Sequence, residues 1–249
     1  MKYRNLFFDL DGTVTDSGNA IMSCARYALE KMGYGEEPEE KLKRFIGPSL
    51  MDSFERLYGM SEEDATKATK LFRSLYVDNK MYDVTVYPGI QELLGKCRDE
   101  GLKTFVVTSK VQAYAERIIE KIGLDGYFTS IVGPDPTDFS SDKSRLINRA
   151  VAEYSLKKKE CVMIGDTRFD IEGAVKAGLD SIAVTYGYGN PTEVQMAHPT
   201  YIADDAADLT DILLKKSLSP IKEIGSRLLF IYSQLNNSFL HSSILASLS

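Results

Sequence analysis

The chain has 249 residues, 43% of them hydrophobic and 27% charged, with a formal net charge of -6 at pH 7. This length can bury the core of one large domain or of two smaller ones. The negative charge argues against a nucleic-acid surface, because phosphate backbones attract clustered Lys and Arg. The three cysteines, which lie far apart, fit no zinc pattern and suit a reducing cytosol. No apolar run resembles a signal peptide or reaches the roughly 18 residues of a membrane span, so we expect a cytoplasmic protein without membrane contact.

A short apolar run at residues 5–8 predicts a buried strand near the N-terminus. Asp9 and Asp11 follow it, and on a strand this spacing puts both side chains on the same side, close enough to repel. Such a pair needs a compensating cation or proton, and Mg²⁺ typically works with one or two carboxylates plus substrate phosphate. Gly12 permits a sharp turn, and Thr13 offers a hydroxyl to the same pocket. The alternative is an Asp-Gly turn with solvated acids.

Residues 16–84 are expected to form an all-helical insertion of four or five helices. Apolar residues recur there at helical spacing, and glycines such as Gly33 and Gly59 end the helices. Arg44 lies beside a Gly-Pro turn in this segment and could meet a substrate carboxylate or a second phosphate. An ordinary helix-end arginine fits the pattern equally well.

From residue 87 onward, strands alternate with helices. The predicted helices cover residues 89–99, 111–122, 142–154 and 167–177, and the predicted strands cover residues 103–108, 130–132, 161–164, 181–184 and 200–202. This alternation indicates βαβ units and a parallel sheet, and continuously apolar strands fit a sheet covered on both faces. We therefore predict an α/β fold with a doubly wound, Rossmann-like parallel sheet at its core.

The C-terminal extension, residues 216–249, differs from the rest in being rich in Ser and Leu. Five apolar residues form one helical stripe there: Ile221, Ile224, Leu228, Ile231 and Leu235. The stripe could dock on the domain as an extra helix or form a dimer contact. An altered C-terminus is a third interpretation, since the α/β pattern is complete by about Leu214.

Polar side chains follow three of the predicted strands, at the edge of the sheet where ligands bind in open parallel sheets. Asp9 and Asp11 follow the first strand, Thr108 and Ser109 the second, and Asp166 follows the strand at residues 161–164. Together they describe an acidic crevice with hydroxyl groups.

Two further residues belong to the predicted crevice. Asp170 lies one helical turn beyond Asp166 and can point the same way. The alternative role for Asp166 is to cap the N-terminus of that helix. So many acids would repel a phosphorylated substrate, and Lys143, at a predicted helix start, is the candidate for the compensating positive charge.

This order of motifs resembles the haloacid dehalogenase (HAD) phosphohydrolase superfamily over about residues 4–205. The motifs are DLDGT, a strand ending in Thr-Ser, a lysine, and GDTRFD. The helical insertion resembles the family's C1-type cap, so the resemblance implies a core of residues 1–15 and 85–215 with a small all-helical cap domain at residues 16–84. Cap length and the segments at residues 87–89 and 186–189 resemble phosphoglycolate-phosphatase-like members.

The resemblance implies roles for four carboxylates. Asp9 is the nucleophile that becomes an aspartyl-phosphate, and Asp11 protonates the leaving alkoxide and later deprotonates water. Mg²⁺ is held by the Asp9 carboxylate, the Asp11 backbone carbonyl and Asp166. Asp170 supports the metal site from outside the ligand shell.

The resemblance also implies a phosphate site. The Thr108 hydroxyl, the Ser109 N–H and Lys143 hold the phosphoryl oxygens in the transition state. Relatives often have Asn where this chain has Ser109. The implied substrate is a small phosphorylated metabolite.

The leading functional interpretation is Mg²⁺-dependent hydrolysis of a small phosphomonoester, phosphoglycolate or a similar compound. A 5′-nucleotidase, a pyrophosphatase or a phosphomutase of the same superfamily is the nearest alternative. A phosphoacceptor signalling module also uses Asp, Thr or Ser, Lys and Mg²⁺ on a doubly wound sheet. It would not need so large a helical insertion.

Overall fold

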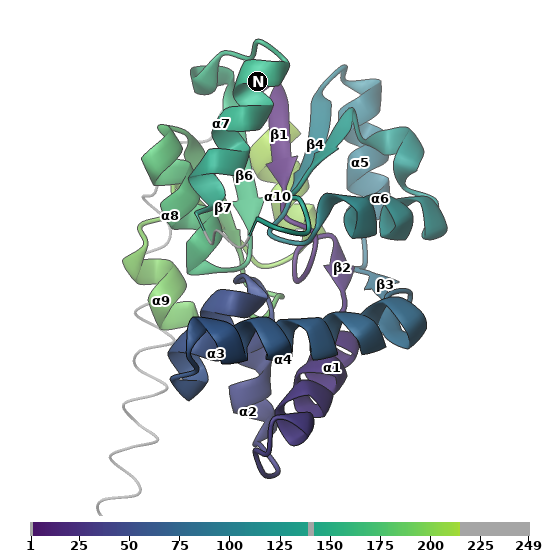
Figure 1. The fold of residues 1–249 in the computed structure, drawn as a ribbon. Coiled ribbons are helices and arrows are strands. Elements are labelled where there is room, and N and C mark those ends of the chain that lie inside the picture. The colour runs from purple at the N-terminus through teal and green to yellow at the C-terminus, as the bar shows by residue number, and fades with distance from the viewer. Residues whose placement is uncertain (1, 139–141, 215–249) are drawn as a thin grey trace, which may run out of the picture. The chain divides into compact units, whose positions relative to one another are not determined.

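A six-stranded parallel sheet forms the centre of the computed structural model, which describes residues 2–138 and 142–214 (Figure 1). The expected apolar stripe that begins at Ile221 lies outside the described residues. The strand order is β5-β4-β1-β6-β7-β8, and the strands are β1 Asn5–Phe8, β4 Lys103–Val107, β5 Ser130–Val132, β6 Cys161–Gly165, β7 Asp180–Val184 and β8 Tyr201–Ala203. The predicted parallel sheet is confirmed. Because β1 pairs with both β4 and β6, the residues that follow β1 lie at the middle of the sheet edge.

Alternate residues of β1 enter separate apolar cores on the two faces of the sheet. Phe8 packs in a cluster with residues of α5, α6 and α10, while Phe7 packs in a cluster with residues of α7 and α8. Both phenylalanines are fully buried. The helices of this part of the chain are α5 Ile90–Asp99, α6 Gln112–Lys121, α7 Lys143–Glu153, α8 Arg168–Ala177, α9 Pro191–Met196 and α10 Ala206–Leu214. The period of two along an apolar strand thus produces the doubly covered sheet.

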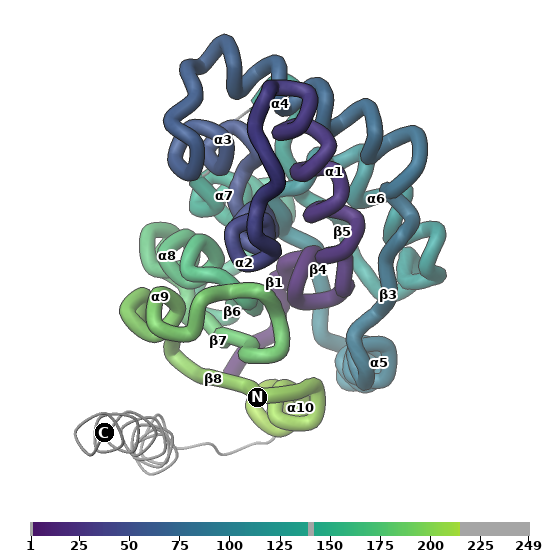
Figure 2. The backbone as a smooth tube through the Cα atoms, turned by 90° about the horizontal axis from the view of Figure 1, so that it is seen from below, coloured from purple at the N-terminus to yellow at the C-terminus, as the bar shows by residue number. Residues whose placement is uncertain are grey.

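Between β1 and α5 the chain forms the helical insertion that the sequence predicts. Its helices are α1 Gly18–Lys31, α2 Glu39–Leu42 with the 3₁₀ turn Lys43–Phe45, α3 Leu50–Tyr58, α4 Glu62–Leu75 and the π-helix Tyr76–Lys80. Ser49 and Ser61 cap the N-termini of α3 and α4, and Gly59 ends α3 in the left-handed conformation. The insertion has an apolar core of its own, which also takes in Ile118 of α6, and Figure 2 shows α6 beside the insertion.

A two-stranded antiparallel ribbon, β2 Thr15–Asp16 and β3 Thr85–Val86, joins the insertion to the rest of the chain. The chain leaves through β2 and returns through β3, close to the expected boundaries at residues 15 and 85. The division into core and cap itself stays a prediction. No helix among residues 2–138 and 142–214 combines the length and the apolarity needed to cross a bilayer.

Candidate active site

Three residues of the candidate site directly follow neighbouring strands of the sheet. Asp9 follows β1, Thr108 follows β4 and Asp166 follows β6. The backbone N–H of Asp9 donates to the Ile164 carbonyl (2.9 Å), which continues the strand register to the edge of the sheet. The structure therefore brings the three side chains to one edge, and all three are buried.

A cluster of carboxylates lies at this edge. Asp9, Asp166 and Asp170 each offer a carboxylate oxygen within 4.8 Å of the other two, and all three side chains are buried. The Lys143 ammonium lies between two of them, with its Nζ 2.7 Å from Asp9 Oδ1 and 2.5 Å from Asp170 Oδ1. The first residue of α7 thus supplies the positive charge that the sequence suggested for a helix start. Lys143 pairs with Asp9 and Asp170, so the cluster carries more negative than positive charge when all three acids are ionised.

The first turn of α8 fixes the orientation of Asp170. Its Oδ2 accepts hydrogen bonds from the Thr167 backbone N–H (3.0 Å) and from the Thr167 hydroxyl (2.8 Å). Thr167 is the N-cap residue of the helix, so the alternative that Asp166 caps it is wrong. Asp166 instead accepts from the Tyr188 N–H (2.8 Å) and from the Thr13 hydroxyl (3.2 Å), and its carboxylate turns toward the sheet edge.

Two glycines let loops pack directly on Asp166. A Cβ on Gly12, whose φ is +85°, would lie 2.2 Å from Asp166 Oδ2. A Cβ on Gly187 would lie 2.4 Å from the same oxygen. Any larger residue at either position would displace the Asp166 carboxylate. The absence of a side chain at Gly12 and Gly187 therefore lets Asp166 keep its position.

Burial and mutual repulsion shift the protonation of the cluster. Burial raises the pKa of Asp9 to about 7, although Lys143 acts in the opposite direction. Burial, together with Asp170 and Asp9, raises the pKa of Asp166 to about 8. Burial acts to lower the pKa of Lys143, but Asp170 and Asp9 raise it overall, so the ammonium stays charged. A hard divalent cation with a preference for oxygen ligands, such as Mg²⁺, fits a cluster with this excess of negative charge.

Asp11 has hydrogen-bond partners of its own. The Ser17 hydroxyl (2.5 Å) and the Lys110 ammonium (2.8 Å) both donate to Asp11 Oδ1. Asp9 and Asp11 both lie beyond β1, which ends at Phe8, so the spacing along a strand does not set their directions. The two acids nevertheless line one pocket, and the charge of Asp11 contributes to the raised pKa of Asp9, as the expected repulsion requires. They pair with different lysines.

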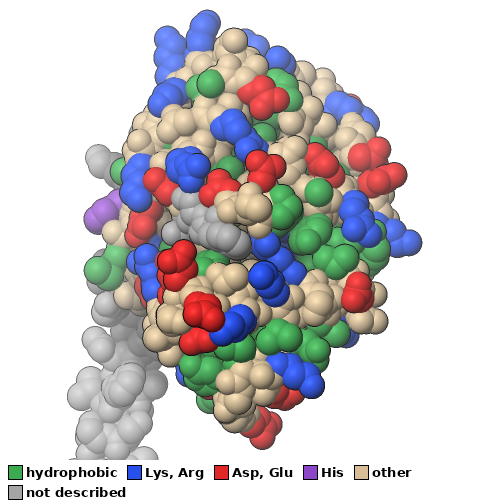
Figure 3. Space-filling model, viewed as in Figure 1, with side chains coloured by type: hydrophobic (Ala, Val, Ile, Leu, Met, Phe, Trp, Pro, Cys, Tyr) green, Lys and Arg blue, Asp and Glu red, His purple; other side chains and the backbone are tan. Residues whose placement is uncertain are grey.

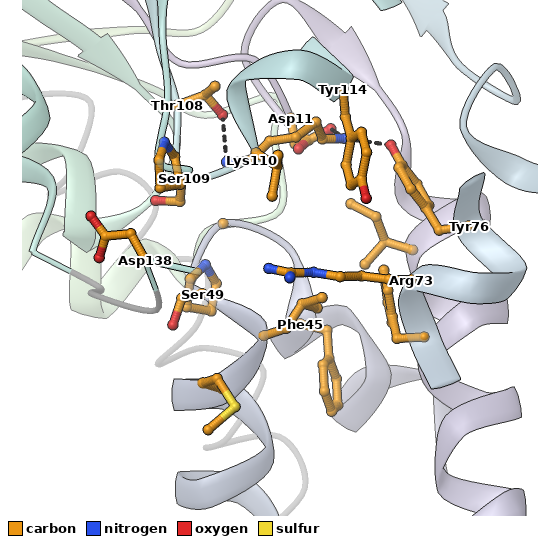
Figure 4. A pocket seen from close by; sticks show the side chains of 18 of the residues that line it. Asp11, Phe45, Ser49, Arg73, Tyr76, Thr108, Ser109, Lys110, Tyr114 and Asp138 are labelled. Carbon is orange, nitrogen blue, oxygen red and sulfur yellow. Dashed lines mark hydrogen bonds and ion pairs between the residues drawn. The ribbon is translucent and has the colours of Figure 1, made fainter. Parts of the chain in front are cut away.

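A pocket opens beside Asp9 and Asp11. The β4 side contributes Thr108, Ser109 and Lys110, and the insertion contributes apolar and aromatic side chains and one arginine: Ile21, Phe45, Leu50, Met51, Phe72, Arg73 and Tyr76. Figure 4 shows Arg73 reaching across the pocket from α4 toward Ser49. The Arg73 guanidinium also donates to the Pro136 carbonyl (2.7 Å), which holds it at the pocket wall.

Arg44, the specificity candidate from the sequence, is exposed and is not among the residues that line the pocket, although its neighbour Phe45 is. It lies on the 3₁₀ turn Lys43–Phe45, which buries Phe45 and leaves Arg44 at the surface. Arg73, and not Arg44, is among the residues that line the pocket, and the part of either arginine in substrate choice stays a prediction. Nothing local in α4 marks Arg73 as a pocket residue, whereas Lys110 directly follows Thr108 and Ser109 and could have been found from that motif.

A sequence model described as haloacid dehalogenase-like hydrolase matches residues 6–184. The chain belongs to this family. A 5′-nucleotidase of Pseudomonas aeruginosa is 33% identical over 86% of this chain and 96% of its own length. A phosphoglycolate phosphatase of Vibrio parahaemolyticus is 28% identical over 83% of this chain and 94% of its own length. The crystal structure of a predicted phosphatase from Clostridium acetobutylicum superposes with a TM-score of 0.83 at 36% identity, over 86% of this chain and 99% of that one.

Proposed function

We propose that this haloacid dehalogenase-like hydrolase cleaves a phosphomonoester through an aspartyl-phosphate formed on Asp9, with Mg²⁺ as its cofactor. The observation that carries the proposal is the buried cluster of Asp9, Asp166 and Asp170, in which Lys143 pairs with Asp9 and Asp170 and Asp9 also lines the neighbouring pocket. Excess negative charge in a buried site requires a cation, and the pocket provides the place for a leaving group.

Asp9 and Asp11 divide the chemistry between them. A carboxylate oxygen of Asp9 attacks phosphorus, the bond to the leaving-group oxygen breaks, and Asp11 gives that oxygen a proton. Water then attacks the aspartyl-phosphate while Asp11 takes the water proton, and phosphate and the free Asp9 carboxylate result. Each acid is held separately in the structure, Asp9 by Lys143 and Asp11 by Lys110.

The cation would be held by the Asp9 and Asp166 carboxylates and the Asp11 backbone carbonyl. When bound, it neutralises charge on the phosphoryl oxygens and on the acids around them. Asp170 suits a supporting role, because one of its oxygens is taken by Lys143 and the other by Thr167.

The phosphoryl oxygens would be held by the Thr108 hydroxyl, the Ser109 N–H and Lys143. Thr108 lies at the end of β4 and is buried, and Ser109 lines the pocket beside it. Lys143 is buried next to Asp9, so its ammonium would lie where charge changes during phosphoryl transfer.

The helical insertion would act as the cap that selects the leaving group. Arg73 in the pocket suits a small anionic leaving group such as glycolate, which keeps a phosphoglycolate-like substrate as the leading candidate. A nucleoside 5′-monophosphate is the second candidate. The apolar and aromatic wall formed by Phe45, Phe72, Tyr76 and Tyr114 favours it, as does the resemblance to a relative named 5′-nucleotidase.

Phosphate release from a panel of phosphorylated metabolites tests the proposal. We expect multiple turnovers with Mg²⁺, loss of activity with a chelator, and recovery when Mg²⁺ is restored. A single turnover that leaves a stable phosphoprotein would instead indicate a phosphoacceptor module, and turnover that is insensitive to chelation would remove the metal from the proposal. On the face shown in Figure 3, Lys and Arg side chains are interspersed with Asp and Glu side chains, whereas a nucleic-acid surface has Lys and Arg clustered together.

A further inference from the structure

Lys110 joins Asp11 to the helical insertion. Its Nζ donates to Asp11 Oδ1 (2.8 Å) and to the Tyr76 hydroxyl (2.6 Å), and both contacts are drawn in Figure 4. The side chains of Lys110 and Asp11 are only 8% and 10% exposed, and Tyr76 is 3% exposed. Lys110 and Asp11 belong to loops at the sheet edge, whereas Tyr76 belongs to the insertion. The hydrogen bonds from Lys110 to Asp11 and to Tyr76 therefore connect the loops that follow the strands with the helical insertion.

Tyr76 occupies a special position in the insertion. It is the first residue of the π-helix Tyr76–Lys80, in which the Met81 N–H donates to the Tyr76 carbonyl (2.7 Å). Such π-helical turns inside or after α-helices frequently mark functional sites. The Tyr76 ring stacks on Phe72, with the ring centroids 5.8 Å apart, and contacts Tyr114 of α6 at 6.4 Å. The aromatic packing fixes where the hydroxyl lies.

Lys110 can orient Asp11 only if its own ammonium group is held in one position. Its flexible four-carbon stem lets the ammonium take many positions, so a single contact with a carboxylate does not orient that carboxylate well. The Tyr76 hydroxyl provides a second anchor, and the Lys110 ammonium also lies 4.9 Å from the centre of the Tyr76 ring. With both anchors in place, Lys110 and Ser17 donate to the same oxygen, Asp11 Oδ1, and together fix the orientation of the carboxyl group.

We propose that Tyr76 and Lys110 are positioning residues, which align the Asp11 carboxyl group for proton transfer to the leaving group when the insertion packs on the sheet edge. The proposal rests on the proposed function, in which Asp11 is the proton donor and acceptor. It adds that residues of the insertion govern proton transfer as well as substrate choice. Neither Tyr76 nor Lys110 needs to touch the reacting phosphorus.

The test compares two leaving groups in the full-length protein with Mg²⁺. An alkyl phosphate needs a proton on its departing oxygen, whereas p-nitrophenyl phosphate expels a stable anion and gains little from an acid. The ratio kcat/KM reports all steps up to release of the leaving group, and so it isolates the first proton transfer. The variants are Tyr76→Phe, which keeps the ring and removes one hydroxyl, and Lys110→Met, which keeps the stem and removes the ammonium.

We expect Tyr76→Phe and Lys110→Met to lower kcat/KM for the alkyl phosphate by about 10- to 100-fold and for p-nitrophenyl phosphate by less than about 3-fold. The double variant should be no worse than Lys110→Met alone, because the Tyr76 hydroxyl acts through Lys110. Tyr34→Phe is the matched control. It removes a hydroxyl from the same insertion at a ring that packs on Tyr58 outside the pocket lining, and it should change neither ratio.

Equal losses for both substrates in Tyr76→Phe, or no loss for either, would overturn the proposal. If Lys110→Met fails to fold, Tyr76→Phe decides the question alone. Asp11→Asn separates this inference from the proposed function. If Asp11→Asn lowers activity selectively for the alkyl phosphate but Tyr76→Phe does not, only the positioning roles are wrong. If Asp11→Asn shows no such selectivity, the proton-transfer role of Asp11 is wrong as well.

Discussion

Replacing Asp166 by Asn should stabilise the metal-free protein while abolishing its response to Mg²⁺. The substitution removes one negative charge from the buried cluster and keeps the shape of the side chain. The asparagine carbonyl can still accept from the Tyr188 N–H, and its amide group can donate to the Thr13 hydroxyl. The change therefore isolates the electrostatic penalty of burying the Asp166 carboxylate beside Asp9 and Asp170.

The size of the effect follows from the raised pKa of Asp166. Burial, Asp170 and Asp9 raise that pKa from 3.8 to about 8, so the folded protein keeps a proton that the unfolded chain has lost above about pH 4. The folded state binds more protons, and stability falls as the pH rises from about 4 to about 8. The interval from the ordinary pKa of about 4 up to pH 7 spans roughly 3 pH units, and each unit lowers the free energy of unfolding by about 1.4 kcal/mol. The ionisation of Asp166 therefore costs about 4 kcal/mol of stability at pH 7. Charges inside proteins are screened more than burial alone implies, so we expect about half of this value, 2 kcal/mol.

Denaturant unfolding at pH 5 and pH 8, with a chelator or with Mg²⁺, measures the effect. With the chelator at pH 8, Asp166→Asn should be more stable than wild type by about 2 kcal/mol, or about 4–8 °C in Tm, and the gain should be much smaller at pH 5. Saturating Mg²⁺ should stabilise wild type by about 2–3 kcal/mol and leave the variant unchanged. Asp99→Asn, at an exposed position, is the control for net charge. If the metal-free variant is less stable than wild type, and both respond equally to Mg²⁺, the charge argument is wrong.

Three further predictions concern single side chains. Asp9→Asn should lower turnover by at least about 10³-fold, because an amide is a poor nucleophile toward phosphorus, and near-native phosphate release would contradict the role given to Asp9. Lys143→Met should destabilise the fold by about 3–5 kcal/mol at pH 8 and by less at pH 5, where Asp9 is protonated; equal losses in urea unfolding at both pH values would contradict this. Arg73→Ala should change the ranking of substrates in the phosphomonoester panel and Arg44→Ala should not, and the reverse result would restore Arg44 as the specificity residue.

Most of the fold could be predicted from the sequence because its strands and helices carry strong patterns. The apolar strands and the glycine-ended helices match the observed elements to within a few residues. The β2–β3 ribbon was not predicted, because its two-residue strands are too short to show a period. Helices α9 and α10 were not predicted either. The strand order depends on pairings between distant segments, which local patterns do not encode.

The candidate site divides in the same way. Asp9, Thr108 and Asp166 could be located because each directly follows an apolar strand. The contact of Tyr76 with Lys110 joins residues 34 positions apart, and only the packing of the insertion brings them together. The charge of Arg44 beside a Gly-Pro turn suggests a substrate contact, but local sequence does not tell which side of the 3₁₀ turn Lys43–Phe45 faces a pocket. The residues that line the pocket from the insertion therefore depend on long-range packing. The acids and the threonine that follow the strands can be located from local sequence.

Mass spectrometry of the protein quenched in acid during turnover tests the central claim most directly. With Mg²⁺ and a phosphomonoester that the protein hydrolyses, the peptide that contains Asp9 should gain the mass of one phosphoryl group. Hydroxylamine should release that group as inorganic phosphate and leave a hydroxamate at Asp9, as expected of an acyl phosphate. Asp9→Asn should show no such adduct. Turnover without any adduct on that peptide under rapid quenching, or an adduct on another residue, would contradict the account.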